Sequence, residues 1–131
     1  MTDPYDLNKS IFSQALKLHQ AGELRQASDL YHQHLSAFPG DPKAWYFSGA
    51  VAFELGDTIG AINSFRRSCE LDGDNAVYRF NLAVALLKMR QLDEAEKEIT
   101  YALKIKPEYP RADNLLAVLC MKQGKYEQAR D

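Results

Sequence analysis

The chain has 131 residues, of which 46% are apolar and 26% are charged, as expected for one ordinary globular domain. Its formal net charge of −2 gives no general attraction to nucleic-acid phosphates or anionic membranes. The longest apolar run, residues 115–121, is too short to cross a bilayer, and residues 1–10 hold no apolar signal segment. These features favour a cytoplasmic protein that neither binds nucleic acid nor inserts into a membrane.

Cys69 and Cys120 both lie within apolar patterns. We interpret them as reduced thiols in the core, as is usual for a cytoplasmic protein, although a disulfide between them stays open at this point.

The sequence repeats itself every 34 residues without a gap. Three columns of small residues carry the repeat: Ala27, Ala61, Ala95 and Ala129; Ala15, Gly49, Ala83 and Ala117; and Gly22, Gly56 and Gly124, with Arg90 at the missing place. A period of this length is typical of repeat architectures, in which each repeat is one supersecondary unit.

The apolar residues within each period have helical spacing. In residues 92–103 they form one face, made of Leu92, Ala95, Ile99, Ala102 and Leu103. The pattern predicts an all-α fold of helix–turn–helix repeats, with a lead-in at 1–7, repeats at 8–41, 42–75 and 76–109, and a truncated fourth repeat at 110–131.

Turn and cap residues lie where these helices should end. The glycine column falls between the two helices of each repeat and predicts the turn there, including one at Gly124. Asp41, followed by Pro42, and Asp57 are predicted N-caps.

At these positions the chain resembles the tetratricopeptide repeat family. The matching residues are Ala15, Leu18, Ala27, Tyr31 and Pro39; Trp45, Gly49, Ala61 and Phe65; Leu82, Ala83, Ala95, Ala102 and Pro107; and Leu116, Ala117, Gly124 and Ala129. The departures are Arg79 and Asp113 at the place of Trp45, and Gly73 in place of proline. The resemblance covers residues 8–131 and implies a right-handed superhelical solenoid whose first helices line a concave groove.

The resemblance also implies where a ligand would bind. The corresponding exposed positions of the first helices are Lys9, Phe12, Leu16, His19, Lys43, Tyr46, Phe47, Phe53, Phe80, Asn81, Val84, Leu87, Lys88, Arg111, Asn114, Val118 and Met121. They are mostly apolar, with cations along the edges. Two interpretations stay open, because aromatic residues at helical spacing form either a ligand groove or the scaffold itself.

One subclass of this family binds the C-terminal carboxylate of chaperone peptides through a fixed set of lysine, asparagine and arginine side chains. Phe12 and Leu16 stand at the first lysine and asparagine places, and Phe47 at the second asparagine place. A start one repeat later retains only Asn81 and Arg111. Binding of chaperone tails is therefore not expected.

No catalytic, cofactor or metal site is expected. The sequence has neither a glycine-rich phosphate loop nor a Cys-x-x-Cys pair. His32 and His34 are two residues apart and point in different directions on a helix, so they cannot share a metal ion. We expect His32 to be solvated and His34 to be a partly buried structural residue.

Two functions remain. The first is a protein-interaction scaffold, not an enzyme, that binds an apolar or amphipathic peptide in its groove. The alternative is an accessory N-terminal domain of a larger enzyme, such as a glycosyltransferase or sulfotransferase. Because the fourth repeat stops early, we also expect the chain to be a fragment of a longer protein, with an open C-terminal end that self-associates.

Overall fold

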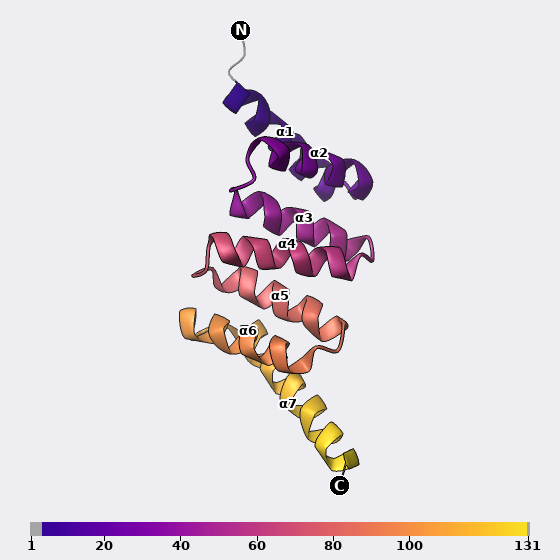
Figure 1. The fold of residues 1–131 in the computed structure, drawn as a ribbon, viewed down its shortest axis with the longest axis vertical. Helices are drawn as coiled ribbons and strands as arrows, with labels where there is room; N and C mark the ends of the chain where they lie inside the picture. The colour runs from indigo at the N-terminus through magenta and orange to yellow at the C-terminus, as the bar shows by residue number, and fades with distance from the viewer. Residues whose placement is uncertain (1–3, 131) are drawn as a thin grey trace. The chain divides into compact units, whose positions relative to one another are not determined.

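A computed structural model describes the backbone of residues 4–130 and the side chains of residues 10–124. Within these residues it contains seven helices and no strand, which confirms the predicted all-α class (Figure 1). The helices are α1 (Pro4–Gln20), α2 (Leu24–Ala37), α3 (Pro42–Glu54), α4 (Thr58–Leu71), α5 (Ala76–Lys88), α6 (Leu92–Ile105) and α7 (Pro110–Arg130).

The helix boundaries follow the 34-residue period. Helices α2, α4 and α6 begin at Leu24, Thr58 and Leu92, each 34 residues after the last, and all three have 14 residues. Helices α3, α5 and α7 begin at 42, 76 and 110, with the same spacing. The repeat read from small residues is therefore a repeat of helix pairs.

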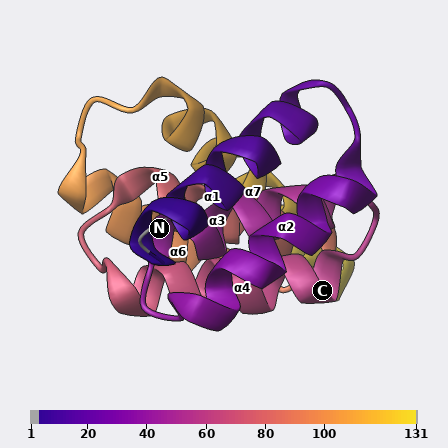
Figure 2. The same cartoon turned by 90° about the horizontal axis from the view of Figure 1, so that it is seen from above.

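The chain divides into two compact units, residues 1–73 and residues 74–131. In the first unit each helix packs on the next, from α1 to α4, and α1 and α2 lie side by side when seen from above (Figure 2). In the second unit α5 packs on α6, and α7 packs on α6 and more lightly on α5.

Small residues let the two helices of a repeat approach closely. Ala27, Ala61 and Ala95 are completely buried. A Cβ atom added to Gly49 of α3 would lie 2.8 Å from the ring of Phe65 on α4, closer than real Cβ atoms come to a neighbour. The glycine therefore makes room for the aromatic ring, and this contact joins α3 to α4.

Side-chain caps begin three of the helices. Asp41 accepts a hydrogen bond from the backbone N–H of Lys43, and Asp57 accepts one from Gly60, so both predicted caps are confirmed. Asn75, 34 residues after Asp41, caps α5 through the N–H of Tyr78. Each cap satisfies a backbone donor that the helix leaves without an internal partner.

The turns between paired helices share one backbone conformation. Gly22 and Gly56 have φ angles of 83° and 89°, and Arg90, which interrupts the glycine column, has a φ of 60°. Residues of this column therefore adopt the left-handed backbone conformation, which glycine accommodates most easily. In the third repeat an arginine adopts it, although its Cβ atom makes this conformation unfavourable.

The turn predicted at Gly124 is wrong, because α7 continues through it to Arg130. Continuing the helix satisfies the backbone groups around Gly124 at a propensity cost of about 1 kcal/mol.

The prediction for the cysteines is half right. Both thiols are free, and Cys69 is buried in α4, but Cys120 is exposed on α7. Periodicity places Cys120 on an apolar face, but within the described residues no second helix packs back on α7 to cover that face.

Arg90 offers a test of the turn. We expect Arg90→Gly to raise the free energy of unfolding by about 0.5–1 kcal/mol, because glycine adopts the left-handed backbone conformation without the steric cost of a Cβ atom. Little packing should be lost, since Arg90 is exposed. The matched change Gly56→Ala should lower it by about 1 kcal/mol, since a Cβ there meets nothing within 4 Å and only the backbone is strained. Urea denaturation followed by circular dichroism measures both. Equal effects of the two substitutions would contradict this view of the turn.

Candidate functional site

An aromatic cluster joins the first three helices of the unit formed by residues 1–73. It consists of Phe12 and His19 from α1, Tyr31 and His34 from α2, and Phe47 from α3. Tyr31 and Phe47 stack with an interplanar angle of 13° and ring centroids 6.1 Å apart. Phe12 lies 5.9 Å from each of these rings and 5.1 Å from His34. Tilted and edge-on contacts of this kind stabilise aromatic packing, so the cluster is mainly scaffold.

A short chain of polar contacts crosses this cluster. His19 Nδ1 lies 3.1 Å from the Tyr31 hydroxyl, and His19 Nε2 lies 3.0 Å from a Glu54 carboxylate oxygen on α3. A neutral imidazole with its proton on Nε2 satisfies both contacts: the tyrosine hydroxyl donates to Nδ1, and Nε2–H donates to the carboxylate.

This Tyr31–His19–Glu54 chain is suited to structure rather than to catalysis. Tyr31 is completely buried. Burial raises the pKa of Tyr31 from 10.0 to about 12, and the Glu54 carboxylate acts in the same direction. A phenol that is both inaccessible and harder to ionise than usual is a poor acid or nucleophile at neutral pH. The contacts instead hold α1, α2 and α3 together.

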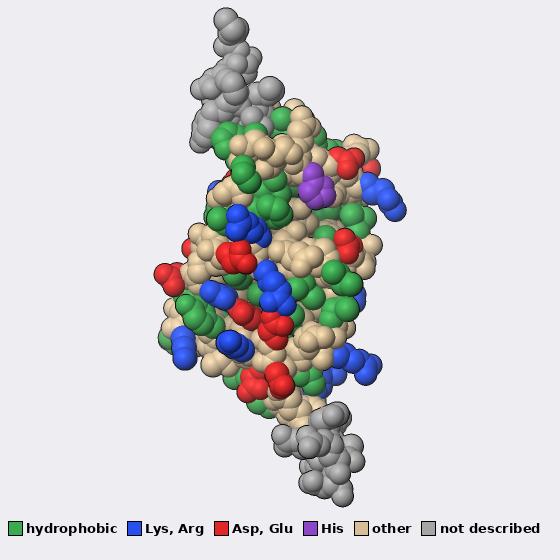
Figure 3. Space-filling view, viewed as in Figure 1, with side chains coloured by type: hydrophobic (Ala, Val, Ile, Leu, Met, Phe, Trp, Pro, Cys, Tyr) green, Lys and Arg blue, Asp and Glu red, His purple; other side chains and the backbone are tan. Residues whose placement is uncertain are grey.

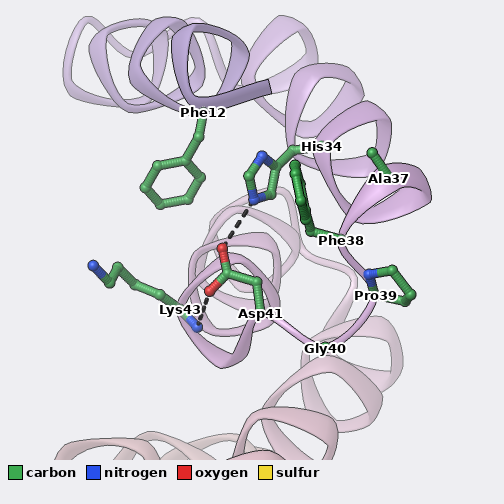
Figure 4. A pocket seen from close by; sticks show the side chains of 8 residues that line it. All are labelled: Phe12, His34, Ala37, Phe38, Pro39, Gly40, Asp41 and Lys43. Carbon is green, nitrogen blue, oxygen red and sulfur yellow. Dashed lines mark hydrogen bonds and ion pairs between the residues drawn. The ribbon is translucent and has the colours of Figure 1, made fainter. Parts of the chain in front are cut away.

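An open pocket of about 630 Å³ lies beside the aromatic cluster (Figure 4). Phe12 reaches it from α1, His34 and Ala37 from the end of α2, and Lys43 from the start of α3, while the connecting loop supplies the rest. The other lining residues are Phe38, Pro39, Gly40 and Asp41. The pocket is thus built at the junction between the first two repeats.

Of the two charged residues that line this pocket, Asp41 has hydrogen-bond partners for its carboxylate, whereas the Lys43 ammonium has no acidic partner among the described side chains. Asp41 uses both carboxylate oxygens: Oδ2 lies 2.9 Å from His34 Nε2, and Oδ1 accepts from the Lys43 backbone N–H at 3.1 Å. The Lys43 side chain is exposed and, among the described side chains, no acidic group pairs with its ammonium. The pocket therefore presents an apolar wall with one cation at its rim.

Phe12 and Lys43 are predicted groove residues and His34 is a predicted structural residue, but the pocket that they share does not follow from the sequence pattern. Phe38 and Ala37 lie at the end of a second helix, outside the first-helix positions to which the groove prediction was restricted. The available signal was Phe38 itself, a large apolar residue directly before Pro39 at the break between repeats. His34 is buried and His32 is exposed, as predicted.

The predicted groove residues of the first unit differ in exposure. Lys43 is exposed, whereas the others are half-buried: Phe12, Leu16, His19, Tyr46, Phe47 and Phe53. Tyr46 packs on Phe47 at 5.1 Å and on Phe65 at 5.9 Å. These aromatics therefore serve the scaffold at least in part. The side chain of Lys9 lies outside the described residues.

In the second unit one predicted groove residue is wrongly placed. Phe80 is only 5% exposed, because its ring lies 5.3 Å from that of Tyr109 and under the guanidinium of Arg111 at 4.9 Å. Asn81, Val84 and Leu87 are half-buried. The exposed predicted residues of this unit are Lys88, Arg111, Asn114, Val118 and Met121.

Other kinds of site find no support in the described part of the chain. It holds no cluster of three or more residues suited to bind a metal ion, and none of its helices is long and apolar enough to cross a membrane. On the face seen in Figure 3, basic and acidic side chains are interspersed, so neither sign of charge forms a large patch there.

Paired helices, small-residue columns and left-handed turns at a fixed 34-residue spacing define a helical repeat protein. Residues 12–76 and 80–131 match the family model described as tetratricopeptide repeat. The chain belongs to the tetratricopeptide repeat family.

Curated relatives match only through part of their length. The chain is 38% identical over 82 residues to the inactive TPR repeat-containing thioredoxin TTL3 of Arabidopsis thaliana, which covers 63% of this chain and 12% of that protein. It is 26% identical over 123 residues to the human protein O-mannosyl-transferase TMTC3. This match covers 93% of this chain and 13% of that protein. The chain thus spans about an eighth of the length of these relatives.

Solved structures share the fold. The first TPR domain of Spaghetti (RPAP3), bound to an HSP90 peptide, aligns with a TM-score of 0.86 and 19% identity over 89% of this chain and 93% of that one. The type III secretion chaperone SycD of Yersinia enterocolitica, in complex with a peptide of the translocator YopD, aligns with a TM-score of 0.84 and 22% identity. The alignment covers 90% of this chain and 95% of that one. The O-GlcNAc transferase of Thermobaculum terrenum aligns with a TM-score of 0.79 and 26% identity. The alignment covers 91% of this chain but only 23% of that one.

The raised pKa of Tyr31 makes stability depend on pH. Because the folded pKa lies above the unfolded one, the contribution of the neutral phenol is complete below pH 10 and is lost as the pH rises towards 12. At pH 8, Tyr31→Phe should lower the free energy of unfolding by about 1 kcal/mol, because a hydrogen bond is lost. By pH 12 this difference should disappear or reverse, because only the parent chain loses stability through ionisation of Tyr31. Urea denaturation at several pH values measures it.

Glu54→Gln supplies the second arm of this experiment. It removes the smaller cause of the raised Tyr31 pKa and retains an acceptor for His19. The alkaline loss of stability should therefore still begin near pH 10, but it should be smaller and level off at lower pH than in the parent chain. A difference between parent and Tyr31→Phe that stays constant from pH 8 to 12 would show that Tyr31 does not titrate in this way.

Proposed function

We propose that this chain is a protein-interaction module that binds an apolar or amphipathic peptide segment along the exposed side chains of its first helices. The observation that carries the proposal is the exposure of apolar side chains on α7, with Val118 at 41% and Met121 at 63%, next to the cation of Lys122. Exposed apolar side chains that gather beside charges mark interaction sites more often than isolated ones do. Related folds that hold an HSP90 peptide and a translocator peptide support the same function.

The proposal makes the chain itself non-catalytic and its partner a protein. The net charge of −2 and the mixed charges of the face in Figure 3 favour a peptide partner over nucleic acid. Two free thiols, one of them exposed, fit a reducing compartment such as the cytoplasm.

Two residues of equal exposure test the proposed surface. Met121 on α7 and Ile59 on α4 are both 63% exposed, but only Met121 occupies a predicted groove position. A peptide selected from a random library against the whole chain serves as ligand. We expect Met121→Glu to weaken its binding about tenfold, since burying a methionine is worth about 1.5–3 kcal/mol, whereas Ile59→Glu should leave binding unchanged. Titration calorimetry measures both affinities.

Equal effects of Met121→Glu and Ile59→Glu on the peptide affinity would contradict the proposal. Binding that survives Met121→Glu, or is lost equally with Ile59→Glu, would place the ligand elsewhere. Circular dichroism controls for folding, which neither change should affect, because both side chains are mainly in solvent.

An accessory role in a larger enzyme is the second candidate. It is favoured by the relatives in which matching repeats occupy a small part of a glycosyltransferase: 13% of the human O-mannosyl-transferase and 23% of the O-GlcNAc transferase structure. A catalytic domain in the same reading frame beyond codon 131 would support it. The peptide-binding test remains informative in either case, because an accessory domain can also bind protein.

Self-association through α7 is a further part of the proposal. In the second and third repeats, the positions equivalent to Ala117 are Gly49 and Ala83, and both are buried. Leu86, the counterpart of Cys120, is also buried, whereas Ala117 and Cys120 are exposed. This uncovered face of α7, which in earlier repeats contacts the second helix, is proposed to pack against another copy of the chain.

Light scattering over a concentration series tests this contact. We expect the average mass to rise above that of one chain as concentration increases, and Cys120→Asp to suppress the rise, because a buried charge without a partner is strongly unfavourable. Ala21→Asp, at an exposed alanine in the first turn, is the matched control and should associate like the parent. A monomeric mass at every concentration would exclude self-association.

A further inference from the structure

We propose that the pocket between the first two repeats receives an aromatic side chain of the bound peptide, and that Lys43 pairs with a carboxylate next to that side chain. The inference rests on the proposed peptide-binding function and names the chemistry of one subsite. It concerns only the unit formed by residues 1–73, since all the lining residues belong to it.

The shape and lining of the pocket favour an aromatic occupant. Its volume of about 630 Å³ lies within the range of pockets that hold small ligands. Three rings form its wall: Phe12 lies 5.1 Å from His34, and His34 lies 5.3 Å from Phe38, at tilts of 44° and 39°. Rings that are tilted against one another offer both faces and edges, which is the arrangement in which another aromatic ring packs well.

The charges favour a carboxylate beside that ring. The Asp41 carboxylate binds His34 and the backbone N–H of Lys43, and among the described side chains it forms no ion pair with the lysine ammonium. Lys43 is exposed, extends along the Phe12 side of the pocket in Figure 4, and has no acidic partner among the described side chains. A ligand carboxylate would complete an ion pair at the rim, and a ligand cation there would be repelled.

The walls of the pocket are held in place independently of any ligand. The Asp41 carboxylate ties the end of α2, through His34, to the first turn of α3. The indole N–H of Trp45 donates to the carbonyl of Pro39 at 2.7 Å and fixes the connecting loop. A pocket whose walls are already ordered loses little conformational entropy when it is filled, which favours binding.

The only tryptophan of the chain provides a local reporter. We would record amide and indole NMR signals of the whole labelled chain while adding acetyl-Gly-Phe-Asp-Gly-amide. The expected result is a saturable shift of the Trp45 indole signal and of the amides of residues 38–43. The Asn analogue of the probe should bind about two- to fivefold more weakly, the range expected for one exposed ion pair. The analogue with Ala in place of Phe should give no saturable shift.

Two pairs of variants separate the pocket from its surroundings. Ala37→Phe should fill the pocket and abolish the shifts, whereas Ser36→Phe, at the exposed neighbouring position that does not line it, should leave them unchanged. Lys43→Gln should make the Asp and Asn probes bind equally, while Lys17→Gln, an exposed lysine on α1, should preserve the difference. None of these residues is buried, so folding should be retained in all four.

The outcomes distinguish this inference from the wider proposal. Unchanged binding in Ala37→Phe, shifts confined to other residues, or equal binding of the Asp and Asn probes to the parent chain would overturn it. If Met121→Glu still weakens the selected peptide in that case, only the subsite is wrong. If the probe binds as expected and Met121→Glu has no effect, the subsite stands and the extended groove is wrong.

Discussion

Close contact between the two helices of a repeat is the constraint on which the rest of this structure depends. It requires a small residue on the first helix wherever a large one projects from the second, as where Gly49 meets the ring of Phe65. Ala27, Ala61 and Ala95 supply the complementary small surface on the second helices and are completely buried. Once two helices lie this close, the turn between them is short and must reverse the chain, and the left-handed φ of Gly22, Gly56 and Arg90 follows from that requirement.

The parts of the structure that depend on neighbours within one repeat were predictable from the sequence. Helix boundaries follow the 34-residue period, and the caps at Asp41 and Asp57 are local hydrogen bonds that need only residues two or three positions away. Such features are encoded in short stretches, so a single sequence carries enough information to place them.

The failures concern burial, which depends on what packs against a helix from outside its own helix pair. Phe80 was expected to be accessible but is covered by Tyr109, at the end of its own repeat, and by Arg111, at the start of the next one. Cys120 was expected in the core but is exposed, because the covering second helix is not formed within the described residues. The pocket at Phe38 was missed for a related reason: it arises where a second helix ends against the next first helix, and a column-by-column comparison of first helices cannot show it.

The first repeat differs from the others in a way that explains why the pocket lies there. His34 stands where the next two repeats carry Ser68 and Ala102. Ser68 satisfies its hydroxyl within its own helix, by donating to the carbonyl of Phe65, and Ala102 needs no partner. A buried imidazole cannot be satisfied so locally, because its second nitrogen projects away from its own backbone. It reaches Asp41 instead, and the larger ring holds Phe12 and Phe38 on either side of it. The polar requirement of one histidine therefore links the cap of α3 to an aromatic wall. Lys43 lies beside this wall, and its ammonium has no acidic partner among the described side chains.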